Sequence, residues 1–130
     1  MKIIDGKDGV LGRIASYAAK ELLQGEEIAL VNCDKIIITG ARLFTEEEFI
    51  KKRSRVGRMQ RGPRHIRTSE KIVKRTVRGM LPNYREGRGR EAWKRIKCYS
   101  GIPKEFEGKK MIEMKAEIKN KFARVKEFAH

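Results

Sequence analysis

Residues 2–31, KIIDGKDGVLGRIASYAAKELLQGEEIALV, decide the fold of this chain. The short apolar run at residues 2–4 predicts a buried strand. In residues 10–24 the apolar side chains recur at the spacing of one helix face, and Gly25 supplies a C-terminal stop. Residues 28–31 form a second apolar run, which suits a strand buried on both faces. Strand, helix and strand within about 30 residues make a βαβ unit, which predicts an α/β protein with a parallel sheet.

Six further elements extend this unit toward the C-terminus. Apolar runs predict two more strands, at residues 35–39 and 96–99, so that four strands are expected in all. Four more helices are predicted. A capping box of Thr45 and Glu48 with basic residues at the far end predicts one at 45–53. Apolar side chains at helical spacing predict one at 70–80 and a final amphipathic helix at 109–127, and a short helix is expected at 90–95. Residues 54–68 and 83–89 have no apolar pattern, and we expect them to form extended loops. At 130 residues the chain has the length of one domain, so we expect a single domain over residues 1–130.

The charge of the chain is concentrated in residues 51–104. This segment holds 19 of the 32 Lys and Arg residues and only three acids, so its formal charge is +16, against +15 for the whole chain. Like charge at this density opposes a compact state unless a polyanion offsets it. Arg outnumbers Lys in the segment, and the arginines alternate with Gly and Pro in the loops. These features favour phosphate binding over an ordinary solvated face, so we expect a nucleic-acid partner.

The glycines at positions 6, 9 and 12 raise the alternative of a nucleotide-dependent enzyme, because they lie between a predicted strand and a predicted helix. A dinucleotide-binding loop needs the spacing G-x-G-x-x-G. Counted from Gly6, the second and third glycine positions are held by Asp8 and Leu11. No Gly-Lys-Ser/Thr follows either, as a P-loop requires. We therefore interpret these glycines as structural turns.

Catalytic and metal-binding side chains are scarce. His65 and His130 are the only histidines, too few for a histidine-based metal site. A nucleophile pair of Cys33 and His65 has no evident third member. Cys33 and Cys98 lack a CxxC partner, as is typical of reduced thiols, and no apolar run approaches the roughly 18 residues of a membrane span. We expect no enzyme activity, cofactor, metal, small-molecule substrate or membrane partner.

The position of the arginines bears on the choice between RNA and DNA. DNA-binding proteins usually offer a recognition helix for the major groove. Arginine-rich loops on an α/β body instead suit irregular folded RNA. His65 lies among these arginines, and we interpret it as a phosphate or base contact. Tyr84 and Trp93 are candidates to stack on unpaired bases, although Trp93 is as well suited to pack beneath its helix. A DNA-binding regulator stays open as a further alternative.

Four motifs within residues 10–103 resemble one known family. They are VLGRIASYAAKELLQGEEIALVNCDKIIITG (10–40), RGPRHIR (61–67), SEKIVKRTVRGMLP (69–82) and RGREAWKRIKCYSGIP (88–103). In this order they resemble the universal large-subunit ribosomal protein thirteen in its archaeal and eukaryotic form. The chain departs from the family pattern after Lys104, so the final helix at 109–127 rests on apolar spacing alone.

The resemblance implies a three-layer α/β/α fold around a four-stranded parallel sheet. It also implies a cytoplasmic structural constituent of the large ribosomal subunit that binds ribosomal RNA directly, adjoins other ribosomal proteins and joins early in assembly. By motif match, the RNA-contacting positions would lie in the loop at 61–67, along the helix at 70–80 and in the loop at 83–90. With three more arginines of the basic segment, the expected RNA-binding residues are Arg53, Arg55, Arg58, Arg61, Arg64, His65, Arg67, Lys71, Lys74, Arg75, Arg78, Arg85, Arg88 and Arg90.

Overall fold

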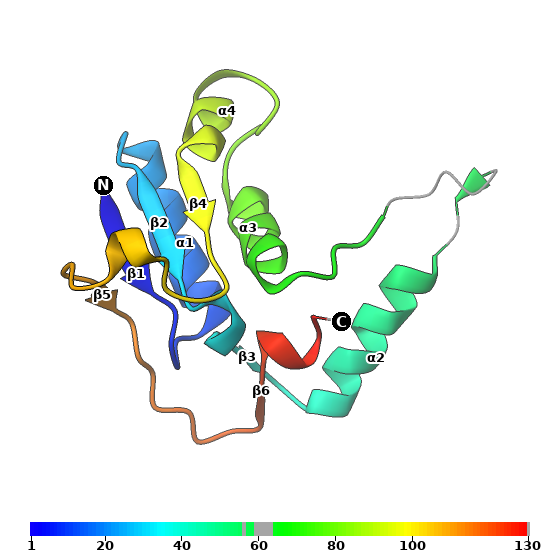
Figure 1. Cartoon of the computed structure of the whole chain (residues 1–130). Helices are drawn as coiled ribbons and strands as arrows, with labels where there is room; N and C mark the ends of the chain where they lie inside the picture. The colour runs from blue at the N-terminus through cyan, green and yellow to red at the C-terminus, as the bar shows by residue number, and fades with distance from the viewer. Residues whose placement is uncertain (56, 59–63, 130) are drawn as a thin grey trace.

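A four-stranded parallel sheet forms the centre of the protein (Figure 1). The computed structural model describes residues 1–55, 57–58 and 64–129 of the chain. The strands, in the spatial order β4-β2-β1-β5, are β1 (Lys2–Asp5), β2 (Ile28–Val31), β4 (Ile96–Cys98) and β5 (Ile112–Glu113). β1 and β2 pair over their full length, with Ile4 opposite Leu30. The predicted α/β class and four-stranded parallel sheet are confirmed.

The two central strands are buried on both faces, as their continuous apolar runs predicted. Ile4 and Leu30 belong to the core on one face, which three helices cover: α1 (Leu11–Leu23), α3 (Ser69–Met80) and α4 (Gly87–Lys94). Ile3 and Val31 belong to a smaller core on the other face. There Phe106 of a 3-10 turn, η3 (Lys104–Phe106), provides the cover. The period of two along each strand therefore assigns neighbouring residues to different cores.

α1 and α3 pack against each other above the sheet. The buried stripe of α1 contains Ala15 and Ala18, whose small side chains let α3 approach closely. α3 contributes Val73 and Val77, both fully buried, to the contact. The packing of this apolar stripe fixes the rotation of α3 about its own axis, and with it the direction of every other side chain on that helix.

The apolar run predicted as a strand at residues 35–39 does form a strand, but outside the central sheet. After β2, Asn32 adopts a left-handed backbone (φ 55°), and a 3-10 turn, η1 (Cys33–Lys35), redirects the chain. β3 (Ile37–Thr39) then pairs antiparallel with β6 (Phe122–Arg124) in a separate two-stranded sheet. An apolar run indicates burial, and Ile37 is indeed buried, but the run does not specify the partner strand.

The predicted helix at residues 109–127 is wrong. The segment contains β5, β6 and a 3-10 turn, η4 (Val125–Glu127). Met111 packs in the smaller core, whereas Ile112 and Met114 pack in the larger core on the opposite face. This alternation belongs to a strand, and it coexists in the sequence with apolar spacing that also fits a helix. The edge of β1 decides the outcome, because it offers main-chain partners to an added strand.

α2 (Arg42–Ser54) projects away from the central sheet (Figure 1). None of its residues is fully buried, and Leu43 is 74% exposed. The helix begins three residues before the predicted start at Thr45, whose hydroxyl donates to the Ala41 carbonyl oxygen within the first turn. Among the described helices, none has the length and apolarity that a membrane span requires.

The C-terminal segment attaches α2 to the rest of the protein. The Phe49 ring of α2 stacks on the Phe128 ring, with centroids 5.2 Å apart and planes 4° from parallel. Arg42 Nε lies 3.0 Å from a carboxylate oxygen of Glu127 in an ion pair. We call α2 and residues 55, 57–58 and 64–67 the arm, and the rest of the described chain the body.

Candidate nucleic-acid interface

α3 presents a cationic face because its opposite face is fixed in the core. Ile72, Val73 and Val77 point into the body, against α1 and β4. The residues on the remaining faces of the helix include four of the predicted RNA-binding residues, Lys71, Lys74, Arg75 and Arg78. Lys71 and Arg75 are exposed, whereas Lys74 and Arg78 are half-buried. The cations are thus held on a helix whose orientation is set by apolar packing.

Aromatic rings orient several of these cations. Lys74 Nζ lies 4.9 Å from the centroid of the Trp93 ring, and the Arg78 guanidinium carbon lies 4.5 Å from that of Tyr84. Arg85 reaches the same Tyr84 ring at 5.5 Å. A hydrogen bond from Arg85 and its charge lower the pKa of the Tyr84 hydroxyl. Each ring therefore already carries a cation, which fixes the position of that charge at the surface.

The remaining predicted cations lie in the loops, in the arm and in the first turn of α4. This helix begins at Gly87, three residues before the predicted start, so Arg88 and Arg90 are helical. Arg64 and Arg67 are exposed just before α3, and Arg61 lies outside the described residues. The other exposed arginines of the set are Arg55, Arg58, Arg85, Arg88 and Arg90. In the described part of the chain, the ion pairs involve other cations, for example Lys2 with Glu21 and Arg124 with Asp8. The exposed arginines named here have no carboxylate partner within that part.

Arg53 differs from the other predicted residues. Its Nη2 group donates a hydrogen bond to the Phe128 carbonyl oxygen, and its guanidinium carbon lies 5.6 Å from the Phe49 ring centroid. Burial and, secondarily, the charge of Arg67 lower the pKa of Arg53. Arg53 thus connects the arm to the C-terminal segment, a role that its charge alone did not reveal.

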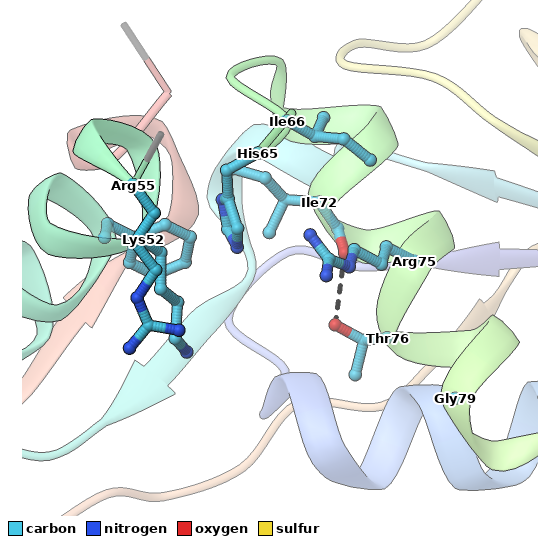
Figure 2. A pocket seen from close by; sticks show the side chains of 9 residues that line it. Lys52, Arg55, His65, Ile66, Ile72, Arg75, Thr76 and Gly79 are labelled. Atoms are coloured by element: carbon cyan, nitrogen blue, oxygen red, sulfur yellow. Dashed lines mark hydrogen bonds between the residues drawn. The ribbon is translucent and has the colours of Figure 1, made fainter. Parts of the chain in front are cut away.

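A cleft of about 410 Å³ separates α2 from α3 (Figure 2). It brings together three predicted residues that are distant in sequence, Arg55, His65 and Arg75. The residues that line it are Phe49, Lys52, Arg55, His65, Ile66, Ile72, Arg75, Thr76 and Gly79. Sequence reasoning missed the contributions of Phe49, Lys52, Thr76 and Gly79, because the cleft arises from the tertiary placement of α2 and no local pattern marks it.

His65 lies at the centre of this cleft (Figure 2). Its ring meets the Phe49 ring edge to face, with centroids 5.7 Å apart and planes at 84°. Burial and then the charge of Arg75 lower the pKa of His65 from its ordinary value of 6.5. The imidazole is therefore mainly neutral at pH 7, with one nitrogen as donor and the other as acceptor. Among the described residues, buried Nδ1 has no hydrogen-bond partner.

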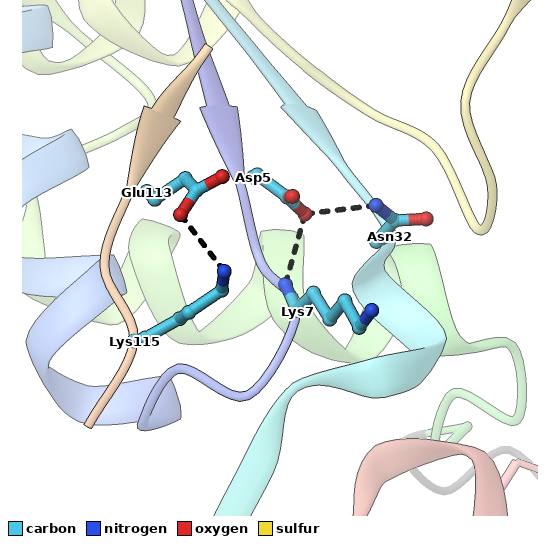
Figure 3. Close-up of polar contacts among 5 residues, drawn as sticks. All are labelled: Asp5, Lys7, Asn32, Glu113 and Lys115. Carbon is cyan, nitrogen blue, oxygen red and sulfur yellow. Dashed lines mark hydrogen bonds and ion pairs between the residues drawn. The ribbon is translucent and has the colours of Figure 1, made fainter. Parts of the chain in front are cut away.

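The carboxyl ends of the central strands, where α/β proteins commonly bind nucleotides, are occupied by the chain itself (Figure 3). The Asp5 carboxylate accepts hydrogen bonds from the Lys7 amide at 3.0 Å and from Asn32 Nδ2 at 2.8 Å. Glu113 and Lys115 form an ion pair at 2.9 Å beside them.

The glycines at this end of the sheet are packed against the core. A Cβ atom added at Gly6 would lie 2.7 Å from Ile36 Cγ1, and one at Gly9 would lie 2.5 Å from Ile14 Cδ1. Gly6 and Gly9 flank a turn and serve close packing, in agreement with their interpretation as structural turns. Gly12 lies within α1, so the same interpretation is wrong for that residue.

The cysteines are free thiols. Cys33 is fully buried and its Sγ lies 3.6 Å from the Leu30 carbonyl oxygen. Interaction with Cys98, together with burial, raises the pKa of the Cys33 thiol, which keeps it protonated. Within the described residues, no group of three or more His, Cys, Asp or Glu side chains is placed to hold a metal ion.

Comparison with known proteins identifies the family. The family model described as "Ribosomal protein L13" matches residues 1–105. The chain belongs to the ribosomal protein uL13 family. Large ribosomal subunit protein uL13 of Methanosphaera stadtmanae is 46% identical over 125 residues, which are 91% of this chain and 85% of that protein. Its counterpart from Archaeoglobus fulgidus is 37% identical over 126 residues, 97% of this chain and 80% of that protein.

Membership of the uL13 family confirms the resemblance found in the sequence motifs. The chain is a structural component of the large ribosomal subunit, and its location is that subunit. It is not an enzyme, because the uL13 family is non-enzymatic, and the nucleotide-dependent alternative is excluded. Membership of the subunit also implies ribosomal RNA and ribosomal proteins as its partners.

Proposed function

We propose that this uL13-family chain binds the RNA of the large subunit directly. The contact surface is formed by the outward face of α3, the loop before α4, the first turn of α4 and the arm. The observation that carries the proposal is that the exposed arginines of this surface, including Arg64, Arg67 and Arg75, have no carboxylate partner within the described chain. Unpaired cations at this density favour a polyanion as partner, and RNA phosphates supply one.

The arrangement of α3 supports direct binding, because the helix needs no rearrangement to present its charges. Its buried residues belong to the larger core, and the cations of Lys74 and Arg78 lie over the rings of Trp93 and Tyr84, which hold them in position. Side chains that are already oriented lose less conformational entropy on binding than freely rotating ones.

We also propose that the chain joins the subunit early in assembly. The body closes its cores from its own residues on both faces of the sheet. It can therefore fold before any ribosomal protein partner arrives and then bind RNA alone. To test this, the affinity of the chain for transcribed large-subunit RNA is measured with and without the other proteins of the subunit. Equal affinity supports early joining, and a requirement for the other proteins contradicts it.

The salt dependence of affinity tests direct binding. If roughly 8–10 phosphate contacts form, the affinity for large-subunit RNA falls with salt at a log–log slope of about −6 to −9. Filter binding between low and physiological salt measures this slope. Competition with duplex DNA of equal length tests the DNA-binding alternative, and equal preference for the two nucleic acids would contradict the proposal.

Replacement of Arg64 and Arg67 together by Ala sharpens the test. The double variant should bind RNA more weakly, with a slope shallower by about 1.4–1.8, and should keep the melting temperature of the unchanged protein. A matched control replaces Arg13 and Lys20, two exposed cations of α1, by Ala. Equal losses of affinity in both double variants would show that net charge matters and that the proposed surface does not. A large fall in melting temperature would show Arg64 and Arg67 to be structural.

A further inference from the structure

The cleft between α2 and α3 combines charge with an apolar lining. Phe49, Ile66 and Ile72 supply apolar walls. Lys52 and Arg55 lie on the α2 side and Arg75 on the α3 side (Figure 2). Among the described residues that line it, none is Asp or Glu. A ligand that matches this lining has a flat, largely apolar part and a negative charge.

Gly79 gives an independent indication that the cleft accommodates a ligand. Glycine weakens a helix relative to alanine, so a glycine within α3 calls for a reason. The backbone gives none, because Gly79 is not among the residues with positive φ. Packing gives none either, because a Cβ added there would meet no described atom within 4 Å. Since Gly79 lines the cleft, the missing side chain leaves the cleft wall open.

His65 supplies a means of recognition inside the cleft. Its ring is held edge-on by Phe49, which in turn stacks on Phe128. The neutral imidazole has one nitrogen that donates and one that accepts. A nucleobase edge carries both donors and acceptors and can pair with either nitrogen, whereas a phosphate group only accepts and can pair only with the donor.

We infer that the cleft between α2 and α3 receives one unpaired nucleotide of the large-subunit RNA. The base lies against Ile66 and Ile72 with its edge toward His65, and the phosphate lies between the cations of the two walls. The cleft volume of about 410 Å³ lies in the range of small-ligand sites. An acidic peptide is the competing occupant. RNA is favoured because Arg75 belongs both to the cleft and to the cationic face of α3, so that one RNA strand can contact both.

This inference rests on the proposed function, and substitutions at Gly79 separate the two. Gly79→Leu fills the cleft from a position with free space, and Gly79→Ala is the matched control. Both keep every cation, and both should melt no lower than the unchanged protein. Gly79→Leu should weaken binding to transcribed large-subunit RNA by about 5-fold, the lower end of the range found for one base stacked on an aromatic side chain. Gly79→Ala should bind as the unchanged protein does.

Ultraviolet cross-linking to the same RNA, mapped by mass spectrometry, gives a second measurement. The expected result is one nucleotide joined to a cleft peptide that contains Phe49 or His65, and loss of this cross-link in Gly79→Leu. His65→Phe, which retains a ring but no nitrogen, should also weaken binding.

If Gly79→Leu binds RNA as tightly as Gly79→Ala and keeps its cross-links, the inference is wrong while the proposed function stands. If the unchanged protein shows no salt-dependent RNA binding, the proposed function itself fails. A cleft cross-link to a ribosomal protein peptide within assembled subunits, in place of RNA, would overturn the inference in favour of the acidic peptide.

Discussion

The body and the arm of this protein are built on different principles. The body buries its apolar side chains on both faces of the sheet, and Leu30 at its centre is fully buried. In the arm, α2 has no fully buried residue and leaves Leu43 and Phe44 74% and 66% exposed. The body can therefore specify its own structure, whereas the arm is held by few contacts and leaves its charge accessible. The difference indicates that stability and the proposed RNA binding are carried by largely separate residues.

A pair of leucine substitutions tests this separation with the largest expected effect. Leu30→Ala removes a fully buried side chain from β2 and should lower the free energy of unfolding by about 2–5 kcal/mol. Leu43→Ala removes the same atoms from the exposed side of α2 and should change it by less than about 0.5 kcal/mol. Urea unfolding followed by circular dichroism measures both. Similar losses in the two variants would show that α2 contributes to the core as much as the sheet does.

A pair of phenylalanine substitutions examines the connection between arm and body. Phe49→Ala removes the stack on Phe128 and the edge contact with His65, and should cost about 1–2 kcal/mol of unfolding free energy. Phe44→Ala, on the same helix but 66% exposed, should cost less than about 0.5 kcal/mol. Limited proteolysis should also cut α2 faster in Phe49→Ala. Equal cleavage rates in the two variants would mean that other contacts hold the arm in place.

The smallest expected effect is a pH dependence at the boundary of the arm. Folding lowers the pKa of His65, so this side chain binds a proton less tightly in the folded protein than in the unfolded chain, where its pKa is near 6.5. The free energy of unfolding should therefore fall as the pH decreases below about 6.5, and this contribution should be absent in His65→Gln. Thermal melts between about pH 7.5 and 5.5 measure the difference between the two proteins, and parallel curves would contradict it.

The βαβ unit and α3 could be predicted from the sequence because their apolar spacing admits one structure each. β3 and β5 could not be placed in this way. The run at Ile36–Thr39 indicates burial but not its partner strand, and Met111 and Met114 fit both a helix and a strand. Only the free edge of β1 and the turn at Asn32 settle these choices, and both arise from tertiary structure.

The charge pattern located the cationic surface, and the structure places Lys71 and Arg75 on the outward face of α3 as expected. The charge pattern did not reveal the cleft, because the cleft depends on the packing of Phe49 against Phe128, about 80 residues further along the chain. A helical glycine without a conformational reason, Gly79, is the one local signal that could have pointed there. Arg53, chosen for its charge, also donates a hydrogen bond to the C-terminal segment, which its charge did not predict.

The placement of β5 has a consequence for synthesis of the chain. β5 covers the edge of a strand that begins at Lys2, yet it lies at Ile112–Glu113. At translation rates of about 5–20 residues per second, β5 is synthesised roughly 4–16 s after β2 is complete. During that interval one side of β1 has no hydrogen-bonded neighbour in the nascent polypeptide, and it gains one only after the helices and the other strands of the central sheet have been made.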